Sequence, residues 1–304
     1  MQKIQIQNIN WVDIVDPKKK DINYLRQVFN FHPIVLNELL VPTLRPKVEH
    51  YDHYLYMVLH FPIYSPKERT SKSMEIDFLI TYNTLITVRY GKIQPVSEFW
   101  KRCEAGQADP HIQNSTASLL YCMLQELNNF SLRQIDHISK KIDKIEKEIF
   151  ETRRGKEEKI VEDISIIRRD ILDFRRAIKP RNTILESLKF KGIEFFGKST
   201  EPYFNDIIGD HMRIWDLLEN HKETIESLQE ANDSLVSNRT NRIMKVLTIF
   251  AVIVFPLTLL ASIFSMNTKY LPIIGAEYDF WIILGIMFLG TIFMLIIFKA
   301  KKWL

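Results

Sequence analysis

The stretch NRTNRIMKVLTIFAVIVFPLTLLASIFSMNTKY, residues 238–270, decides the fold of this chain. It begins as a polar helix and becomes apolar without a break, and none of the 21 residues 246–266 is charged. A helix of that length spans roughly 31 Å, enough to cross the hydrocarbon core of a bilayer. A second uncharged run covers residues 280–298, after a short loop. The sequence therefore predicts a multi-pass membrane protein that ends in a hairpin of two membrane-spanning helices.

Charged residues on either side of the two spans predict their orientation. The intervening loop, residues 267–279, carries one lysine and two acids, whereas basic residues gather outside it. Because basic segments remain on the cytoplasmic side, we expect both termini in the cytoplasm, the loop outside, and the chain in the inner (plasma) membrane. The basic residues that flank the two spans are Arg239, Arg242, Lys245, Lys299, Lys301 and Lys302.

Composition and motifs argue against several classes of function. A formal net charge of +4 on 304 residues is too small to indicate nucleic-acid binding. The chain contains no glycine-rich phosphate loop, nucleophile elbow or Cys-x-x-Cys motif, so we expect neither an enzyme nor an organic cofactor. Cys103 and Cys122 are too few for a disulfide framework and indicate a reducing compartment. The N-terminal segment lacks the apolar run of a signal peptide, so we expect the C-terminal spans to direct insertion.

The pattern of residues 1–110 predicts a mixed α/β fold. A first strand or pair of strands precedes two segments with helical signals and three β-rich runs, one of which alternates with a fully buried face. His50, His53 and His60 raise the question of a metal site, but their spacing matches no zinc pattern, so structural histidines are favoured. The expected helices are residues 21–31 and 33–40, and the expected strands are residues 54–64, 74–82 and 84–90.

From residue 115 onward the sequence is helical. Isoleucines recur every three or four residues in two stripes, which predict an antiparallel helical hairpin over about residues 115–190. We interpret the lysines and glutamates between these isoleucines as a solvated face without a site. Gly192, Gly197 and Pro202 predict a break before the next helix.

That next helix continues into the membrane. Residues 203–266 would span roughly 95 Å if helical throughout, and Gly209 is the weakest point. A helix this long needs lateral partners, either from the preceding hairpin or from copies of itself. Two spans per chain cannot enclose a pore, so a channel function requires an oligomer.

One face of this helix mixes amide, thioether, hydroxyl and apolar groups. Such a face suits a pore with apolar constrictions and a few oxygen-bearing rings, although any apolar helix yields some stripe of this kind. Pro256 permits a kink in mid-span. Asn267, at the end of the span, would give a ring of carbonyl oxygens that contacts hydrated Mg²⁺ without stripping its water. The residues that share the face, at steps of three and four, are Asn241, Met244, Leu247, Ala251, Phe255, Thr258 and Ser262.

Motifs along the chain resemble the CorA family of divalent metal-ion transporters. The segments LYMVLHFP (residues 55–62) and FLITYNTLITV (residues 78–88) are similar to that family's cytoplasmic domain, and the resemblance covers nearly the whole chain. The most specific matches lie on the long helix and at its end: Tyr203-Phe204 with Asp206, Asp210-His211, Asn238-Arg239, Asn241, Met244-Lys245-Val246-Leu247-Thr248, Phe255-Pro256-Leu257-Thr258 and Met266-Asn267.

The resemblance implies an α+β fold: a cytoplasmic αβα domain, a long stalk helix and two C-terminal transmembrane helices, assembled as a homopentameric channel in the bilayer. It implies that Mg²⁺ is both the transported and the regulatory ion, with Co²⁺ or Ni²⁺ as further substrates. The regulatory site would include Asp206 and Asp210. The implied segments are residues 1–200 for the cytoplasmic domain with its hairpin, 201–245 for the stalk, 246–266 for the pore-lining span, 267–279 for the external loop, 280–298 for the outer span and 299–304 for a basic tail.

The resemblance also assigns the two ends of the pore. The ion entrance falls on Asn267, supported by Met266 and Ser265, and Met244 with Leu247 would form a hydrophobic gate.

Two departures from the family bear on selectivity. The family's Gly-Met-Asn motif is Ser265-Met266-Asn267 here, and serine adds a hydroxyl while offering less backbone freedom than glycine. Lys269 lies beside the motif, so Glu277 and Asp279 are expected to supply the negative ring that concentrates cations. Two alternatives stay open: a Zn²⁺ transporter of the ZntB-like branch, which also varies this motif, and a non-conducting, membrane-anchored helical sensor or scaffold.

Overall fold

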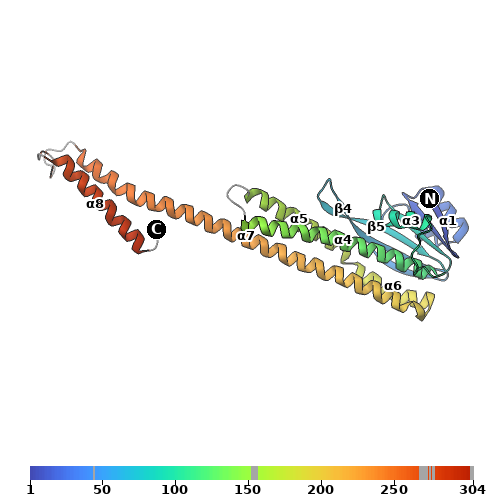
Figure 1. The fold of residues 1–304 in the computed structure, drawn as a ribbon. Helices are drawn as coiled ribbons and strands as arrows, with labels where there is room; N and C mark the ends of the chain where they lie inside the picture. Colours follow the sequence, from blue (N-terminus) through green and yellow to red (C-terminus); the bar gives the residue numbers. More distant parts are fainter. Residues whose placement is uncertain (44, 152–156, 267–272, 274, 276–277, 302–304) are drawn as a thin grey trace. The chain divides into compact units, whose positions relative to one another are not determined.

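A computed structural model describes residues 1–43, 45–151, 157–266, 273, 275 and 278–301. Its internal contacts divide the chain into two compact units, Met1–Gln229 and Glu230–Leu304. The long helix α7, Glu201–Phe264, contributes to both units (Figure 1).

The first unit is built around a six-stranded mixed sheet with the order β1-β2-β6-β5-β4-β3. β2 pairs with β6 in parallel, and every other neighbouring pair is antiparallel. The three predicted β-rich runs are confirmed as β4, β5 and β6. A short edge strand, β3, was not predicted. The strands are β1 (Gln2–Ile6), β2 (Ile9–Val15), β3 (Lys47–Tyr51), β4 (Tyr54–Ser65), β5 (Thr70–Ile80) and β6 (Thr84–Arg89).

Helices cover both faces of this sheet, which confirms the αβα arrangement. On one face, α1 (Lys19–Phe29) and α2 (Pro33–Glu38) place Leu25 and Leu36 in a core with Tyr56 of β4. On the other face, α3 (Gln94–Glu104) places Trp100 in a second core, its ring centroid 4.7 Å from that of Trp11 in β2. Both cores form because apolar residues on each strand point to a helix layer.

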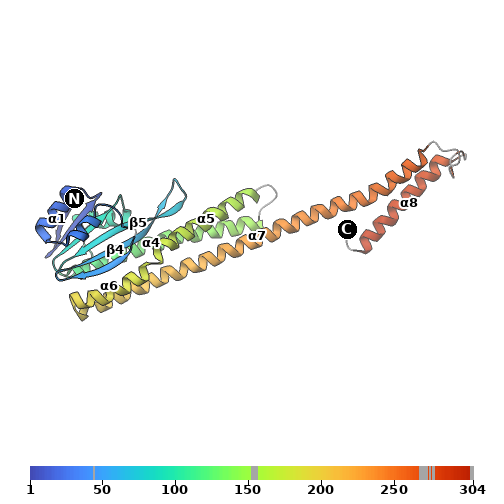
Figure 2. The ribbon, with the colours of Figure 1, turned by 180° about the vertical axis from the view of Figure 1, so that it is seen from behind.

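Two long helices follow, α4 (Thr116–Glu151) and α5 (Glu157–Ile178). The isoleucine stripes that predict them are buried along both. The hairpin of β4 and β5 packs against α5, where Ser71 donates a hydrogen bond to Asp170 Oδ1 at 2.7 Å and Thr70 donates one to Asp173 Oδ2 at 2.8 Å. Figure 2 shows this hairpin and the two helices from behind.

The break predicted before α7 is present, but it lies at Gly197 and not at Gly192, because α6 runs from Arg181 to Phe196. Gly192 instead allows a close approach, because a Cβ there would lie 2.5 Å from the ring of Phe204 on α7. The chain reverses later, at Gly197, whose φ of +94° lies in the region that favours glycine.

The second unit contains the rest of α7 and the helix α8, Asp279–Ala300. Within the described residues, two helices are long and apolar enough to cross a membrane: the one that includes α7 and the one that is α8. Both views show α8 beside the C-terminal part of α7 (Figures 1 and 2).

Candidate ion-conduction path and metal sites

The predicted pore-lining residues lie on one exposed face of α7. Apolar side chains on this face are open to an unusual degree, with exposed fractions of 55% for Met244, 59% for Leu247 and 77% for Phe255. The polar members Asn241, Thr258 and Ser262, and the small residue Ala251, are exposed as well. An uncovered stripe of this kind is available to another surface.

The opposite face of the same helix is the one that is covered in the single chain. Ile249 is buried, and Ile253, Leu257, Leu260 and Phe264 are half-buried. At about 100° per residue, the centre of this covered face lies roughly 180° around the helix from the centre of the exposed stripe. Since α8 lies beside this part of α7 (Figures 1 and 2), the stripe faces away from the chain's own second span.

Oxygen atoms are present on the exposed stripe. Thr258 donates its hydroxyl hydrogen to the carbonyl oxygen of Val254 at 2.9 Å, so its own lone pairs remain free to accept. Pro256 has no N–H, which leaves the carbonyl of Val252 without its helical donor. The segment thus offers neutral oxygens that suit a hydrated cation better than a dehydrated one.

Helical hydrogen bonds continue past the end of α7 as far as Met266. The N–H of Ser265 donates to the carbonyl oxygens of Ala261 at 3.0 Å and Ser262 at 3.2 Å, and that of Met266 donates to Ile263 at 3.2 Å. Both Ser265 and Met266 are exposed. Asn267, the predicted ion entrance, lies outside the described residues.

Of the two acids expected in the external loop, Glu277 and Asp279, the structure describes Asp279. Glu277 lies outside the described residues. Asp279 is the first residue of α8, and its carboxylate accepts hydrogen bonds from the N–H groups of Phe280 at 2.7 Å and Gly275 at 3.2 Å. The first contact satisfies an N–H of the first turn of α8 and the second joins the preceding loop to the helix, so Asp279 has a structural role besides any effect on cations.

The predicted regulatory acids lie one turn apart on α7, within the first unit. Tyr121 of α4 donates a hydrogen bond to Asp206 Oδ2 at 2.8 Å, and its ring centroid is 5.0 Å from that of Tyr203. Partial burial and the charge of Asp206 raise the pKa of Asp210 above its usual range. In the part of the chain that the structure describes, no three His, Cys, Asp or Glu side chains gather as a metal site. A cation at Asp206 and Asp210 would therefore need ligands from water or another subunit.

The three histidines weighed as metal ligands make separate contacts. His50 Nδ1 lies 3.4 Å from Glu194, His53 Nε2 lies 3.2 Å from the carbonyl oxygen of Phe29, and His60 Nε2 lies 3.1 Å from Glu75. Each contact is typical of a structural histidine.

A cavity lined by basic residues of α4 was missed from the sequence. Lys141 and Lys144, interpreted as part of a solvated face, line this cavity together with Tyr64 of β4. No local signal reveals it, because the strand and the helix that form it are far apart in the sequence.

Comparisons with known proteins match nearly the whole chain to one family. The family model described as "CorA-like Mg2+ transporter protein" matches residues 7–301. The cobalt/magnesium transport protein CorA of Thermotoga maritima is 30% identical over 299 residues, which cover 97% of this chain and 83% of that protein. A protein of the same name from Methanocaldococcus jannaschii is 22% identical over 294 residues, covering 97% of this chain and 91% of that protein.

The fold agrees with these sequence matches. The complete structure of the CorA magnesium transporter from Methanocaldococcus jannaschii matches with a TM-score of 0.85 at 21% identity, covering 100% of this chain and 95% of that one. The α/β domain, the long helix and the two apolar C-terminal helices are therefore shared. The chain belongs to the CorA-like Mg²⁺ transporter family.

Proposed function

We propose that this chain is one subunit of a homopentameric channel that conducts divalent cations across the plasma membrane. Membership of the family over residues 7–301 supports transport, and the names of the related proteins support Mg²⁺ and Co²⁺ as substrates, with Ni²⁺ a further candidate. The segment boundaries expected from the sequence are retained. Residues 246–266 and 280–298 lie in the bilayer, and the first unit and both termini lie in the cytoplasm.

One observation supports the pore assignment: within residues 249–264, α7 leaves Ala251, Phe255, Thr258 and Ser262 exposed, whereas the opposite face, from Ile249 to Phe264, is buried or half-buried. Exposed apolar side chains in a bilayer can face lipid, but Thr258 and Ser262 are polar and would be costly there. Copies of the stripe around a central axis satisfy both requirements. Met244 and Leu247 then form the apolar gate, and Asn267 with Met266 and Ser265 forms the outer entrance.

The entrance is tested by flux through liposomes that contain the purified chain. Replacing Asn267 by alanine should lower Mg²⁺ flux by about tenfold or more, since a hydrogen bond to a charged group is worth about 1.5–3 kcal/mol. Asn220→Ala, the same change at an exposed position of α7, serves as the control and should conduct normally. Mg²⁺ flux that survives Asn267→Ala would refute the assignment.

The same assay separates the alternatives. Flux of Zn²⁺ in the absence of Mg²⁺ flux would favour the ZntB-like alternative, and a protein that inserts and assembles but passes none of Mg²⁺, Co²⁺, Ni²⁺ or Zn²⁺ would favour the sensor or scaffold. Chemical cross-linking in the membrane measures the oligomeric state, for which five subunits are expected.

Regulation by internal Mg²⁺ is proposed to act through Asp206 and Asp210. Asp206→Ala should keep flux high when Mg²⁺ inside the liposome is raised, because a carboxylate ligand of the inhibitory ion is lost. Tyr121→Phe is the matched control: it removes the hydrogen bond to Asp206 but leaves the carboxylate, so inhibition should persist. Unchanged inhibition in Asp206→Ala would contradict the proposal.

The serine of the motif is tested by two substitutions in the same flux assay. If the Ser265 hydroxyl contributes to the path, Ser265→Ala and Ser265→Gly should change flux in the same direction. If the backbone freedom of glycine matters, only Ser265→Gly should change it.

A further inference from the structure

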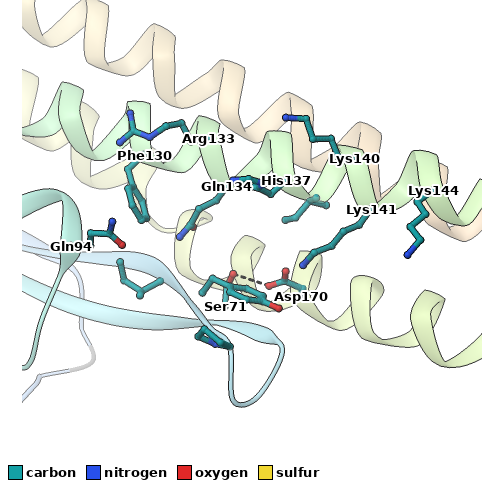
Figure 3. A pocket seen from close by; sticks show the side chains of 14 residues that line it. Ser71, Gln94, Phe130, Arg133, Gln134, His137, Lys140, Lys141, Lys144 and Asp170 are labelled. Atoms are coloured by element: carbon teal, nitrogen blue, oxygen red, sulfur yellow. Dashed lines mark hydrogen bonds between the residues drawn. The ribbon is translucent and has the colours of Figure 1, made fainter.

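A cavity of about 760 Å³ lies within the first unit, between α4, the β4–β5 hairpin and α5. Figure 3 shows its side chains: Lys141, Lys144 and Gln134 extend from α4 toward the strands, and Ser71 and Asp170 meet on the opposite side. This volume falls within the range of roughly 300–1,000 Å³ that is usual for small-molecule sites.

The charge of the lining is predominantly positive. Arg133, Lys140, Lys141 and Lys144 line the cavity. Arg133 pairs with Glu126 at 3.4 Å and Lys140 with Asp136 at 2.6 Å, so Lys141 and Lys144 are the cations that extend to the side of Asp170 (Figure 3). Asp170 is 2% exposed and accepts a hydrogen bond from Ser71 Oγ at 2.7 Å. Burial raises the pKa of Asp170 above its usual value. Because basic side chains outnumber carboxylates in the lining, the cavity favours an anion.

The cationic groups can be recruited by a ligand. The ammonium of Lys141 lies 4.6 Å from the ring centroid of Tyr64, a cation–π contact that leaves its N–H groups able to donate. Lys144 lies 3.8 Å from Glu148, with a side chain that is 69% exposed. Exposed ion pairs of this kind are weak and are readily exchanged for a stronger anion.

The remaining lining is apolar and aromatic. Phe130 and Tyr64 contribute rings, and Ile63 and Ile138 contribute aliphatic surface. The side-chain oxygen of Gln134 is buried here with no hydrogen-bond donor among the described residues. A ligand that fits must therefore combine a flat apolar part, a group able to donate a hydrogen bond, and a concentrated negative charge.

A second cavity of about 200 Å³ shares Tyr64, Lys141 and Lys144 with the first, so the two lysines are reached from both cavities. Arg69, Glu148 and Asp163 also line the second cavity, and Arg69 pairs with Asp163 at 3.4 Å. Lys141 and Lys144 are therefore the cationic groups that the two cavities share.

We propose that this cavity binds a nucleoside polyphosphate. The base would occupy the space beside Phe130 and Tyr64 and donate a hydrogen bond to Gln134, and the phosphates would extend to Lys141 and Lys144. Aromatic rings are sequence-tolerant stacking partners for bases, and lysine ammonium groups bind phosphate as point charges. The site adds a cytoplasmic ligand to the transport function and does not depend on the pore assignment.

Isothermal titration of the purified full chain in Mg²⁺-free buffer tests the proposal with ATP, tripolyphosphate and adenosine as probes. ATP should bind with a Kd below about 1 mM. Tripolyphosphate, which lacks the ring, and adenosine, which lacks the charge, should each bind more weakly. Lys141→Gln/Lys144→Gln should weaken ATP binding by about tenfold or more, or about 1.4 kcal/mol. Lys147→Gln, an exposed lysine of α4 outside the cavity, should leave it unchanged.

A second variant tests the aromatic part separately. Gln134→Leu keeps the charge of the cavity and should weaken ATP while leaving tripolyphosphate unaffected, because only the base reaches that side chain. Absence of ATP binding at about 5 mM, or equal ATP affinity in the wild type and the double lysine variant, would overturn the proposal. Equal affinities for ATP and tripolyphosphate would overturn the assignment to a nucleotide.

Discussion

Replacing Gly192 by alanine should destabilise the first unit, although alanine is the better helix former. The added Cβ would lie 2.5 Å from Cζ and 2.7 Å from Cε2 of Phe204, closer than real Cβ atoms approach their neighbours. Phe204 cannot simply move away, because its side chain is 4% exposed and belongs to the core beneath the sheet. The contact therefore has to be relieved by shifting α6 against α7.

Two opposing terms set the magnitude. Alanine stabilises a helix interior by about 1 kcal/mol relative to glycine, whereas forcing one extra carbon into a packed core costs about 1–3 kcal/mol. The net result is a loss of about 0–2 kcal/mol. Gly209→Ala in α7 is the matched control, since no atom lies within 4 Å of the new Cβ there. It should stabilise the chain by up to about 1 kcal/mol.

Thermal unfolding of the purified full chain, followed by circular dichroism, measures the difference. For a unit of this size, Tm shifts by roughly 2–4 °C per kcal/mol, so the two variants should separate by several degrees, with Gly192→Ala the lower. Adding Phe204→Leu to Gly192→Ala should restore part of the lost Tm, because the ring that the new Cβ would contact is removed. If Gly192→Ala raises Tm as much as Gly209→Ala does, the close-approach argument is refuted.

Three further predictions concern two buried charged sites and one acid at the start of α8. Burial holds the pKa of Asp77 well above its usual value, so the folded state retains a proton that the unfolded chain releases, and stability falls as pH rises between the two pKa values. Asp77→Asn should remove that decline, so the free energy of unfolding of the variant relative to wild type should increase from pH 5 to pH 8. Denaturant unfolding at both pH values measures this difference, and a difference that stays the same would contradict the prediction. Arg89→Met should cost about 3–5 kcal/mol, because Asp13, 2.8 Å from it and fully buried, is left unpaired; Asp13→Asn added to it should restore part of that loss in the same measurement. Asp279→Ser should preserve Mg²⁺ flux because a serine hydroxyl can also accept the hydrogen bond from the N–H of Phe280, whereas equal loss of flux in Asp279→Ser and Asp279→Ala would show that the charge matters more than this hydrogen bond.

Local patterns predict the elements whose burial repeats along one helix or strand. The isoleucines of α4 and α5 recur at helical spacing, and each contacts a core that lies on one side, so periodicity alone identifies them. The same logic predicts β5, where Ile76, Phe78 and Ile80 alternate toward one core. The edge strand β3 carries no such signal: of its residues Lys47–Tyr51 only Val48 is buried. Its strand conformation depends on pairing with β4, which a local pattern does not report.

Contacts between distant segments explain the other differences. Gly192, Gly197 and Pro202 together predicted the break before α7, but Gly192 lies inside α6, and the ring of Phe204 that requires a glycine there belongs to the next helix. The basic cavity is another case, since Lys141 and Tyr64 become neighbours only when the β4–β5 hairpin packs on the helices. The stripe proposed to line a pore follows from spacing on a single helix, whereas the contact of Asp279 with the N–H of Gly275 depends on how the preceding loop meets α8.

Ser265 can be located on α7 by the same helical geometry. Among the described residues, positive φ occurs at positions other than Ser265, so a residue with a Cβ fits there without strain. At about 100° per residue, Ser265 falls on the same side of α7 as Thr258 and Ser262 and away from the covered face. Ser265 therefore adds a third hydroxyl to the row formed by Thr258 and Ser262. Hydroxyl oxygens accept hydrogen bonds from the water shell of a cation, so we expect Ser265 to lengthen the polar part of the path and to alter selectivity rather than block the entrance.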